Sequence, residues 1–377
     1  MISGNRFSLT RFSLAIWLAL ILGVGMAATA SAQKIDLTAR DAAITELSRA
    51  GKYSEAILLA QRLLADLEKA YGPDHRDVAA SLNNLALLYG NAGRDAEAEP
   101  LYRRSLAATE KAFGPDSAEV GAGLTNLAAL YQRQQRHAEA EPLFKRSLAI
   151  RERKLGAGHP DVAQSLNNLA THYEKLDRHA DSEPLFRRAL AIYEKAAGPE
   201  HPAVATVLNN LGQVAKVEGN YSKAEPLIKR SLAIREKVLG PNHPDVARSL
   251  NNLGEVYEFQ SRYSDAERLL ERALAIREAT VGPDHPDTAK STNNLVQLYA
   301  NSGYPDKALP LAQRLIASGR AELGAVLPAL ADAKAQQLLS ADTSLDLALD
   351  AIQRGTQSSA ASAVNKLAVR LAAGTDR

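Results

Sequence analysis

The residues of this sequence with the clearest capacity for chemistry are its eight histidines, because imidazole transfers protons near neutral pH and binds zinc. Five of them recur at multiples of 42 residues, at His75, His159, His201, His243 and His285. If each period is one structural unit, equivalent residues lie at least the packing distance of two helices apart, about 8–10 Å. Zinc–ligand bonds are only about 2 Å long, so this series cannot form a zinc site. We interpret these histidines as turn and helix-cap residues.

The remaining candidates for catalysis form no complete site. His172 and His179 can approach each other, but we find no acidic partner to complete a site with them, and His137 lies elsewhere in the sequence. Three serines recur at a small-residue position that packing explains: Ser105, Ser147 and Ser231. The chain has no cysteine, which excludes thiolate nucleophiles and thiolate zinc sites, and it has no G-x-S-x-G, phosphate-binding glycine loop or H-E-x-x-H motif. We therefore predict no enzymatic activity, no cofactor and no metal.

Length and composition favour a helical repeat array. The chain has 377 residues, more than a usual single-core domain, and 46% of them are hydrophobic but only 5% aromatic. Helices that pack closely through small side chains suit this composition better than a β-sandwich does. Lys and Arg number 45 against 43 Asp and Glu, and Arg6 and Arg11 account for the difference. The rest of the chain is formally neutral, so its charge does not indicate nucleic-acid binding.

Residues 1–32 have the features of a targeting segment. Two arginines precede an apolar run at 14–26, and Ala30-Ser31-Ala32 forms a small-x-small cleavage site before Gln33. The alternative is an uncleaved anchor helix, but the unbroken apolar run is shorter than the roughly 20 residues that span a bilayer. We predict cleavage after Ala32, a periplasmic or secreted protein, and no stable membrane insertion after the leader is removed.

The sequence repeats itself every 42 residues. The period is carried without insertion by six glycines: Gly72, Gly114, Gly156, Gly198, Gly240 and Gly282. Within one period, apolar residues recur at helical spacing in 82–89 and again in 98–106, on either side of a break at 91–93. Two such helices cannot bury their apolar stripes alone, so each pair must stack on its neighbours.

A loop of the form Gly-Pro-Asp-His-Pro-Asp, clearest at 282–287, closes each period. We expect Gly282 to adopt the left-handed C-cap conformation and Pro286 with Asp287 to begin the next helix. A proline also lies a few residues inside most second helices, at Pro100, Pro142, Pro184, Pro226 and Pro310. Because proline removes a backbone donor, the helix either starts later or bends there.

The pattern Asn-Leu-Ala/Gly-x-x-Tyr, followed by a Gly and an Ala, resembles the tetratricopeptide repeat. The 42-residue length and the phrases Leu-Asn-Asn-Leu and Gly-Pro-x-His-Pro resemble the kinesin light chain type of that family. The resemblance covers about residues 35–320, or seven repeats, and implies an all-α, right-handed superhelical solenoid of helix pairs. The predicted organisation is a leader at 1–32, a solenoid at 33–320 and a helical cap at 321–377.

One asparagine per repeat points away from the apolar stripe of its own first helix: Asn84, Asn126, Asn168, Asn210, Asn252 and Asn294. In tetratricopeptide arrays first helices line the concave surface, so the resemblance implies that this ladder faces a groove. There an amide can read a peptide backbone, because it both donates and accepts. The alternative is that the ladder forms hydrogen bonds between repeats, and both roles are compatible. For the preceding series we favour structural bonding: Asn83, Asn167, Asn209, Asn251 and Asn293.

The residues around the ladder vary from repeat to repeat. The polar members of this face are Arg133, Gln164, Lys175, Gln213, Arg248, Glu255, Lys290 and Gln297. A constant amide flanked by changing side chains suits a groove that holds different peptides with some preference. We predict a non-enzymatic scaffold that binds a protein or peptide segment in this groove.

The period stops after about Ala321. We expect three more helices, at 324–339, 342–353 and 358–373, which together cap the last repeat. Residues 345–374 also resemble the helical stretch before the caspase-like CHAT domain of bacterial repeat proteins. That resemblance implies an alternative function, a regulatory fragment of a CHAT-type peptidase system without its catalytic domain.

Overall fold

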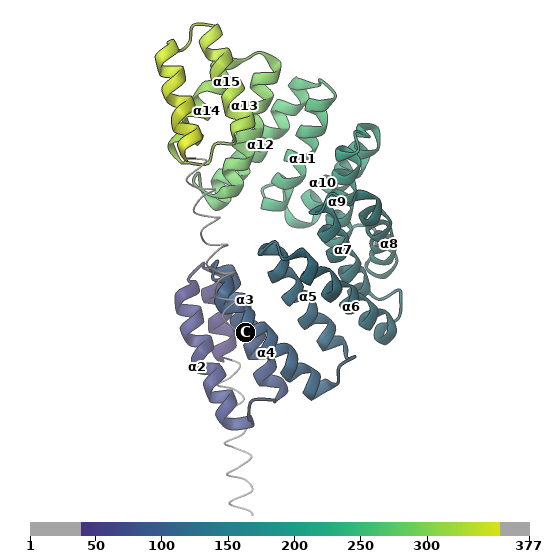
Figure 1. Cartoon of the computed structure of the whole chain (residues 1–377). Helices are drawn as coiled ribbons and strands as arrows, with labels where there is room; N and C mark the ends of the chain where they lie inside the picture. Colours follow the sequence, from purple (N-terminus) through teal and green to yellow (C-terminus); the bar gives the residue numbers. More distant parts are fainter. Residues whose placement is uncertain (1–38, 355–377) are drawn as a thin grey trace, which may run out of the picture. The chain divides into compact units, whose positions relative to one another are not determined.

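The computed structural model describes residues 39–354, and all regular secondary structure in this range is helical (Figure 1). A helix at 39–49 is followed by α2 (Tyr53–Tyr71), α3 (Arg76–Asn91), α4 (Asp95–Phe113), α5 (Ala118–Arg133), α6 (His137–Leu155), α7 (Pro160–Glu174), α8 (His179–Ala197), α9 (Pro202–Val217), α10 (Tyr221–Leu239), α11 (Pro244–Phe259), α12 (Tyr263–Val281), α13 (Pro286–Ser302), α14 (Pro305–Ala317), α15 (Leu323–Ala335) and a helix at 341–354.

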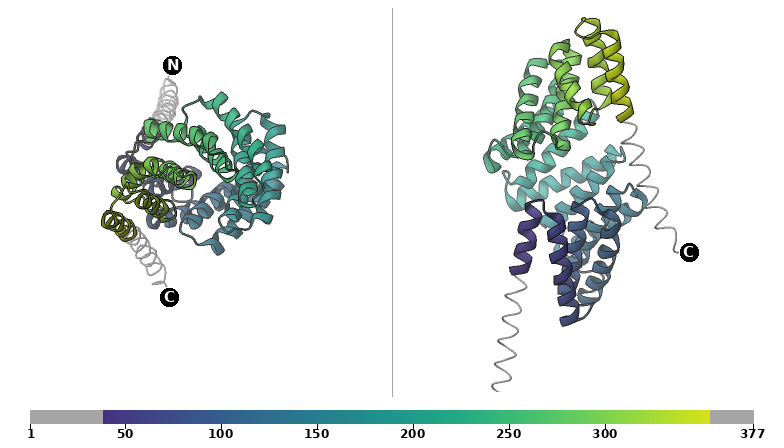
Figure 2. Two further views of the ribbon diagram at one scale, coloured as in Figure 1. Left: turned by 90° about the horizontal axis from the view of Figure 1, so that it is seen from above. Right: turned by 90° about the vertical axis from the view of Figure 1, so that its left-hand side faces the viewer.

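The chain forms two compact units, the first ending at Ala140 and the second beginning at Glu141. In each unit the two helices of a repeat pack against one another, and the second helix then packs against the first helix of the next repeat (Figures 1 and 2). The predicted all-helical solenoid of stacked helix pairs is confirmed. In the second unit one continuous core extends from Ala215 on α9 to Ala351 in the helix at 341–354.

The recurring loop histidines begin the first helices. His285 is the N-cap of α13, and its Nδ1 accepts a hydrogen bond from the backbone N–H of Asp287 at 3.1 Å. His75, His159, His201 and His243 cap α3, α7, α9 and α11 in the same way. The side chain satisfies one of the backbone donors that a helix start leaves open. The prediction that these histidines are cap residues is confirmed.

Two local expectations change. Gly282 does have a positive φ of 91°, but its ψ of 163° places it outside the left-handed helical region that we expected. This extended conformation, open almost only to glycine, turns the chain out of α12 into the loop.

The sequence left open whether second helices start after their proline or bend there. Helix α4 starts at Asp95 and continues through Pro100 to Phe113. The second helix therefore does not start after its proline.

Second helices are joined by ion pairs. Glu194 on α8 pairs with Arg230 on α10 at 2.7 Å, and Glu236 pairs with Arg272 at 2.6 Å. Each of these two carboxylates is only 34% exposed. Arginine from the following repeat shields them. Such partly exposed pairs each contribute about 0–1 kcal/mol, so they mainly fix the register of neighbouring repeats.

The residues after the last repeat continue its packing. Val326 and Leu330 on α15 are buried against the core of α13 and α14, and Asn293 binds the connecting segment. Its Nδ2 donates to the backbone oxygen of Arg320 and its Oδ1 accepts from the N–H of Glu322. The helix predicted at 324–339 already ends at Ala335.

No helix among the described residues is long and apolar enough to cross a membrane. The predicted leader and the helix expected at 358–373 lie outside the described residues.

Candidate functional site

The first helices of the second unit form a closely spaced row. Helices α7, α9, α11 and α13 contact one another in sequence, although a second helix separates each from the next along the chain. We call this set the first-helix row. It carries the predicted binding residues from Gln164 to Gln297, with Lys175 at the C-cap of α7, so these residues belong to neighbouring helices.

The asparagine ladder makes hydrogen bonds between repeats. In the second unit Asn210 Nδ2 donates to Asn167 Oδ1 at 3.1 Å, and Asn252 Nδ2 donates to Asn209 Oδ1 at 3.0 Å. Asn252 is only 8% exposed. These contacts are the hydrogen bonds between repeats that the alternative interpretation of the ladder predicted. The Oδ1 atoms of Asn210 and Asn252 accept no hydrogen bond from the described residues, which leaves an acceptor on each amide.

The ladder changes partner at its C-terminal end. Asn294 Nδ2 donates to Glu255 Oε1 at 2.9 Å, and the other oxygen of this carboxylate pairs with Lys216. A polar chain thus joins α9, α11 and α13. In the preceding series, Asn251 is buried, and we assign its amide oxygen to the atom 3.0 Å from Arg277 Nη1, because that side of the amide faces only donors. Structural bonding is therefore shown for members of both series.

The flanking residues of the first-helix row divide into bound and unbound side chains. Arg248 pairs with Asp245 at 3.1 Å, and Gln164 accepts from Arg151 Nη1 at 3.3 Å. Lys175, Lys290 and Gln297 are exposed, and their side chains make no hydrogen bond or ion pair with the described residues. Gln213 is half-buried, and its buried Nε2 has no acceptor there either. Asn168 is half-buried on α7.

In the first unit the predicted residues lie on α3 and α5. Asn84 is exposed, whereas Asn126 Nδ2 donates to Asn83 Oδ1 at 2.8 Å, which repeats the ladder contact. Arg133 pairs with Asp95 at 2.8 Å. Arg133 is therefore tied to the start of α4.

Buried arginines are the feature that the sequence analysis missed. Arg235 on α10 is 2% exposed, and its Nη1 donates to the backbone oxygen of Asp245 at 3.0 Å and to Ser249 Oγ at 2.8 Å. Burial lowers the pKa of Arg235 to about 10, and the carboxylate of Asp245 opposes that shift. Arg151 and Arg277 make the same two contacts, ten and fourteen residues further along the chain. The 42-residue spacing of Arg235 and Arg277 was the available signal.

A second missed cluster joins Glu174, His179 and Ser182. His179 Nδ1 lies 3.1 Å from Glu174 Oε2, so the acidic partner that we did not find in the sequence is present. Ser182 is fully buried, and its Oγ donates to Glu174 and to the backbone oxygen of His179, not to the imidazole. The imidazole therefore does not activate the hydroxyl, and the cluster holds α7 to α8 instead. Among residues 39–354 no group of three or more His, Cys, Asp or Glu side chains could hold a metal ion.

Comparison with solved structures shows where the fold recurs. BtubC (BKLC) from P. vanneervenii is 27% identical over 62% of this chain and 91% of that chain, with a TM-score of 0.51. A kinesin light chain-type protein of Podosopora anserina, with nearly identical TPR-like repeats, is 27% identical over 55% and 98%, with a TM-score of 0.47. Cut9–Hcn1 of the APC/C resembles this chain in fold alone, at 16% identity over 77% and 48% and a TM-score of 0.57. No curated protein matched the sequence.

The family comparison covers most of the described chain. The tetratricopeptide repeat matches residues 37–118, 119–195, 161–227, 204–279 and 262–321. The predicted resemblance to the tetratricopeptide repeat is confirmed, and a kinesin light chain-type repeat protein is among the structures similar to this chain. The matched segments end at 321, so the resemblance of residues 345–374 to the stretch before CHAT domains stays a prediction. Sequence, helix pairing and family match agree that this chain belongs to the tetratricopeptide repeat family.

Proposed function

We propose that this protein is a non-catalytic scaffold that binds an extended polypeptide segment along the first-helix row. Tetratricopeptide repeats generally mediate protein–protein interaction, which supports the class of partner. The row offers amide oxygens at Asn210 and Asn252 as acceptors for backbone N–H groups of a bound segment.

The observation that carries this proposal is the contrast between first and second helices. Four second-helix arginines of the second unit are tied to glutamates of the preceding repeat: Arg188, Arg230, Arg272 and Arg314. On the first-helix row, Lys175, Lys290 and Gln297 stay exposed without a partner among the described residues. Side chains that make no internal hydrogen bond or ion pair can bind a ligand without loss of contacts that stabilise the fold. Their identities also change from repeat to repeat, which allows preference among ligands.

The test reverses charges on one face at a time. The tagged full-length protein is recovered from its own cells with bound polypeptides, which mass spectrometry identifies. The variant K175E/K290E should lose these polypeptides while keeping its helicity and melting temperature. Lys195 lies on second helix α8, exposed and likewise without a partner, so K195E is the matched control and should keep them. Equal capture by both variants would contradict binding along the first-helix row.

We also propose that residues 1–32 direct export and are then removed. The support is the order of charge, apolar run and small-x-small site in the sequence. Intact-mass measurement of the protein isolated from the periplasm or medium should give a chain that begins at Gln33. Replacing Ala32 by Arg should block processing and leave the longer species. A chain that still begins at Met1 in the unaltered protein would contradict this proposal.

A further inference from the structure

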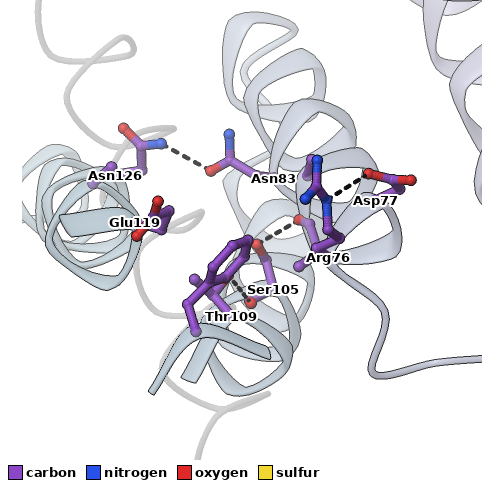
Figure 3. Close-up of a pocket in the computed structure, with 12 residues that line it drawn as sticks. Arg76, Asp77, Asn83, Ser105, Thr109, Glu119 and Asn126 are labelled. Carbon is purple, nitrogen blue, oxygen red and sulfur yellow. Dashed lines mark hydrogen bonds and ion pairs between the residues drawn. The ribbon is translucent and has the colours of Figure 1, made fainter. Parts of the chain in front are cut away.

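A cavity of about 490 Å³ lies in the first unit between α3, α4 and α5. Figure 3 shows Thr109 and Ser105 from α4, Asn83 from α3 and Glu119 from α5 around it. Ser105 Oγ donates to the backbone oxygen of Ala79 at 2.7 Å, and Thr109 Oγ1 donates to that of Ser105 at 2.8 Å. Ligand pockets usually measure about 300–1,000 Å³, so the cavity is large enough for a side chain.

The repeat period explains why the cavity is here. Residues that occupy the place of Thr109 in repeat 1 and in repeats 3 to 6 are Leu67, Arg151, Tyr193, Arg235 and Arg277. All of these side chains are larger than threonine. On α5 the cavity is lined by Gly123, whose counterparts beside Arg235 and Arg277 are Ser249 and Ser291. Small residues on both walls therefore leave open a space that other repeats fill from within.

The groups that bind the internal arginines have counterparts in this cavity. Arg277 Nη1 contacts the backbone oxygen of Asp287, and the amide oxygen of Asn251 faces the same nitrogen at 3.0 Å. The equivalent residues four repeats earlier in the sequence are Glu119 and Asn83, and both line the cavity. The carbonyl and amide acceptors of a guanidinium site are thus present without the arginine: Asn83 Oδ1 accepts from Asn126 Nδ2, and its second lone pair is available to a ligand.

The charge around the cavity also suits a cation. Arg76 and Asp77 line it as an ion pair at 3.5 Å, so their charges largely cancel. Glu119 is exposed and forms no ion pair with the described residues, which leaves one net negative charge. Phe113 also lines the cavity and is 41% exposed, and an aromatic face attracts a guanidinium more readily than a neutral amide.

We propose that this cavity binds the side chain of an arginine carried by a polypeptide partner, at the place that Arg151, Arg235 and Arg277 fill in later repeats. The inference rests on the proposed function, because it names a side chain that a polypeptide partner of this scaffold would carry. Arginine is favoured over lysine because its planar fork donates to several acceptors at once, as the internal arginines do.

The test uses N-acetyl-arginine methylamide as the probe and ligand-observed NMR to measure its dissociation constant for the full chain. The matching citrulline derivative has nearly the same shape without the charge. The lysine derivative has the charge without the planar set of N–H donors of a guanidinium. The arginine probe should bind at least tenfold more tightly than citrulline. Equal affinity for arginine and citrulline would overturn the proposal, as would tighter binding of lysine.

Two variants locate the site. T109R places the chain's own guanidinium in the cavity, as in later repeats, and should abolish probe binding. E119Q removes the unpaired carboxylate at the surface and should weaken the probe roughly three- to tenfold without changing melting. The control is D287N, which changes the equivalent carboxylate beside Arg277 and should leave binding unchanged. Unaltered binding by E119Q and a folded T109R would place the probe elsewhere and contradict the proposal.

The outcomes separate this inference from the proposed function. If polypeptides are still captured through the first-helix row but the arginine probe does not bind, only the arginine preference fails. If the probe binds and is lost in T109R while no polypeptide is captured, the cavity is real and the scaffold function fails.

Discussion

Asn252 Nδ2 donates to Asn209 Oδ1 at 3.0 Å, and both side chains are buried, at 8% and 4% exposure. The contact joins first helices α9 and α11, whose backbones lie in neighbouring repeats. Buried polar groups stabilise a structure when they are paired and cost free energy when they are not. The asparagine pair is therefore a structural bond between repeats, whatever else its free oxygen contacts.

We predict that N252A lowers the free energy of unfolding by about 1–3 kcal/mol, because it leaves the buried Oδ1 of Asn209 without a donor. Urea denaturation followed by circular dichroism measures this change. Asn84 is the equivalent residue in repeat 2, exposed and without a side-chain hydrogen bond to the described residues, so N84A should stay within about 0.5 kcal/mol. A variant N252A that is as stable as the original but loses its partner would assign Asn252 to the ligand alone.

The buried arginine on α10 leads to a second prediction. R235A should destabilise the protein by about 2–5 kcal/mol, because it opens a cavity and removes the donor to Ser249 and to the Asp245 carbonyl. R235M should lose less, since methionine keeps much of the volume and removes a buried charge. Arg230 on the same helix is 42% exposed and binds Glu194 and the backbone oxygen of Pro199 at the surface, so R230A should cost less than about 1 kcal/mol. If urea denaturation gives equal losses in the free energy of unfolding for R235A and R230A, the buried contacts of Arg235 do not stabilise the protein more than the surface pair of Arg230.

The sequence predicted what depends on one helix and left open what depends on its neighbours. The stripe and cap of α13 follow from local spacing, so the capping role of His285 could be predicted. Arg235 lies in a charged stretch that looks solvated until α11 is placed against it. Its partners are ten and fourteen residues away, across a loop, and helical periodicity does not fix that packing.

The asparagine ladder shows the same limit. The sequence predicts that Asn252 points away from its own stripe, and in the structure its amide donates to Asn209 of the preceding repeat. Opposing one's own core and being exposed are different properties in a solenoid, because the neighbouring repeat supplies a second surface. Whether a residue that faces away from its own core is also exposed depends on how the neighbouring repeat packs against it.

Glu258 on α11 gives a prediction on pH. Burial raises its pKa above the ordinary value of 4.5, the charge of Glu255 adds to the rise, and the hydrogen bond from Asn301 and the charge of Lys216 oppose it. The folded protein therefore holds this proton more tightly than the unfolded chain. Glu258 consequently lowers stability as pH rises above 4.5. E258Q keeps an acceptor for Asn301 and should be more stable than the original at about pH 7, with the difference vanishing in acid.

The matched control for this prediction has the opposite sign. A hydrogen bond from Lys229 lowers the pKa of Glu225, and those from Gln260 and Arg262 add to this against partial burial. Its contribution to stability is present above its unfolded pKa and is lost as pH falls. E225Q should therefore be less stable than the original at about pH 7 and equal to it in acid. Urea denaturation at a series of pH values tests both variants, and parallel profiles would refute the assignment.

Gly254 on α11 marks a close approach of two helices. A Cβ added there would lie 2.7 Å from Leu270 Cδ2 and 2.8 Å from its Cγ, closer than carbon atoms pack. Alanine gains about 1 kcal/mol of helix propensity, but overpacking costs about 1–3 kcal/mol, so G254A should be destabilised. At Gly123 the new Cβ would lie 3.4 Å from Leu106 Cδ1, so G123A should be neutral or stabilised.

A second substitution tests whether the clash with Leu270 is the cause. Repeat 4 pairs Ala170 with Phe186 at the same two positions, and both are buried in one core cluster. A flat ring can lie against an added methyl group where a branched Leu270 cannot. The double variant G254A/L270F should therefore recover most of the stability that G254A loses, measured by urea denaturation. Additive losses in the double variant would show that the close approach of the backbones, and not the shape of residue 270, requires glycine on α11.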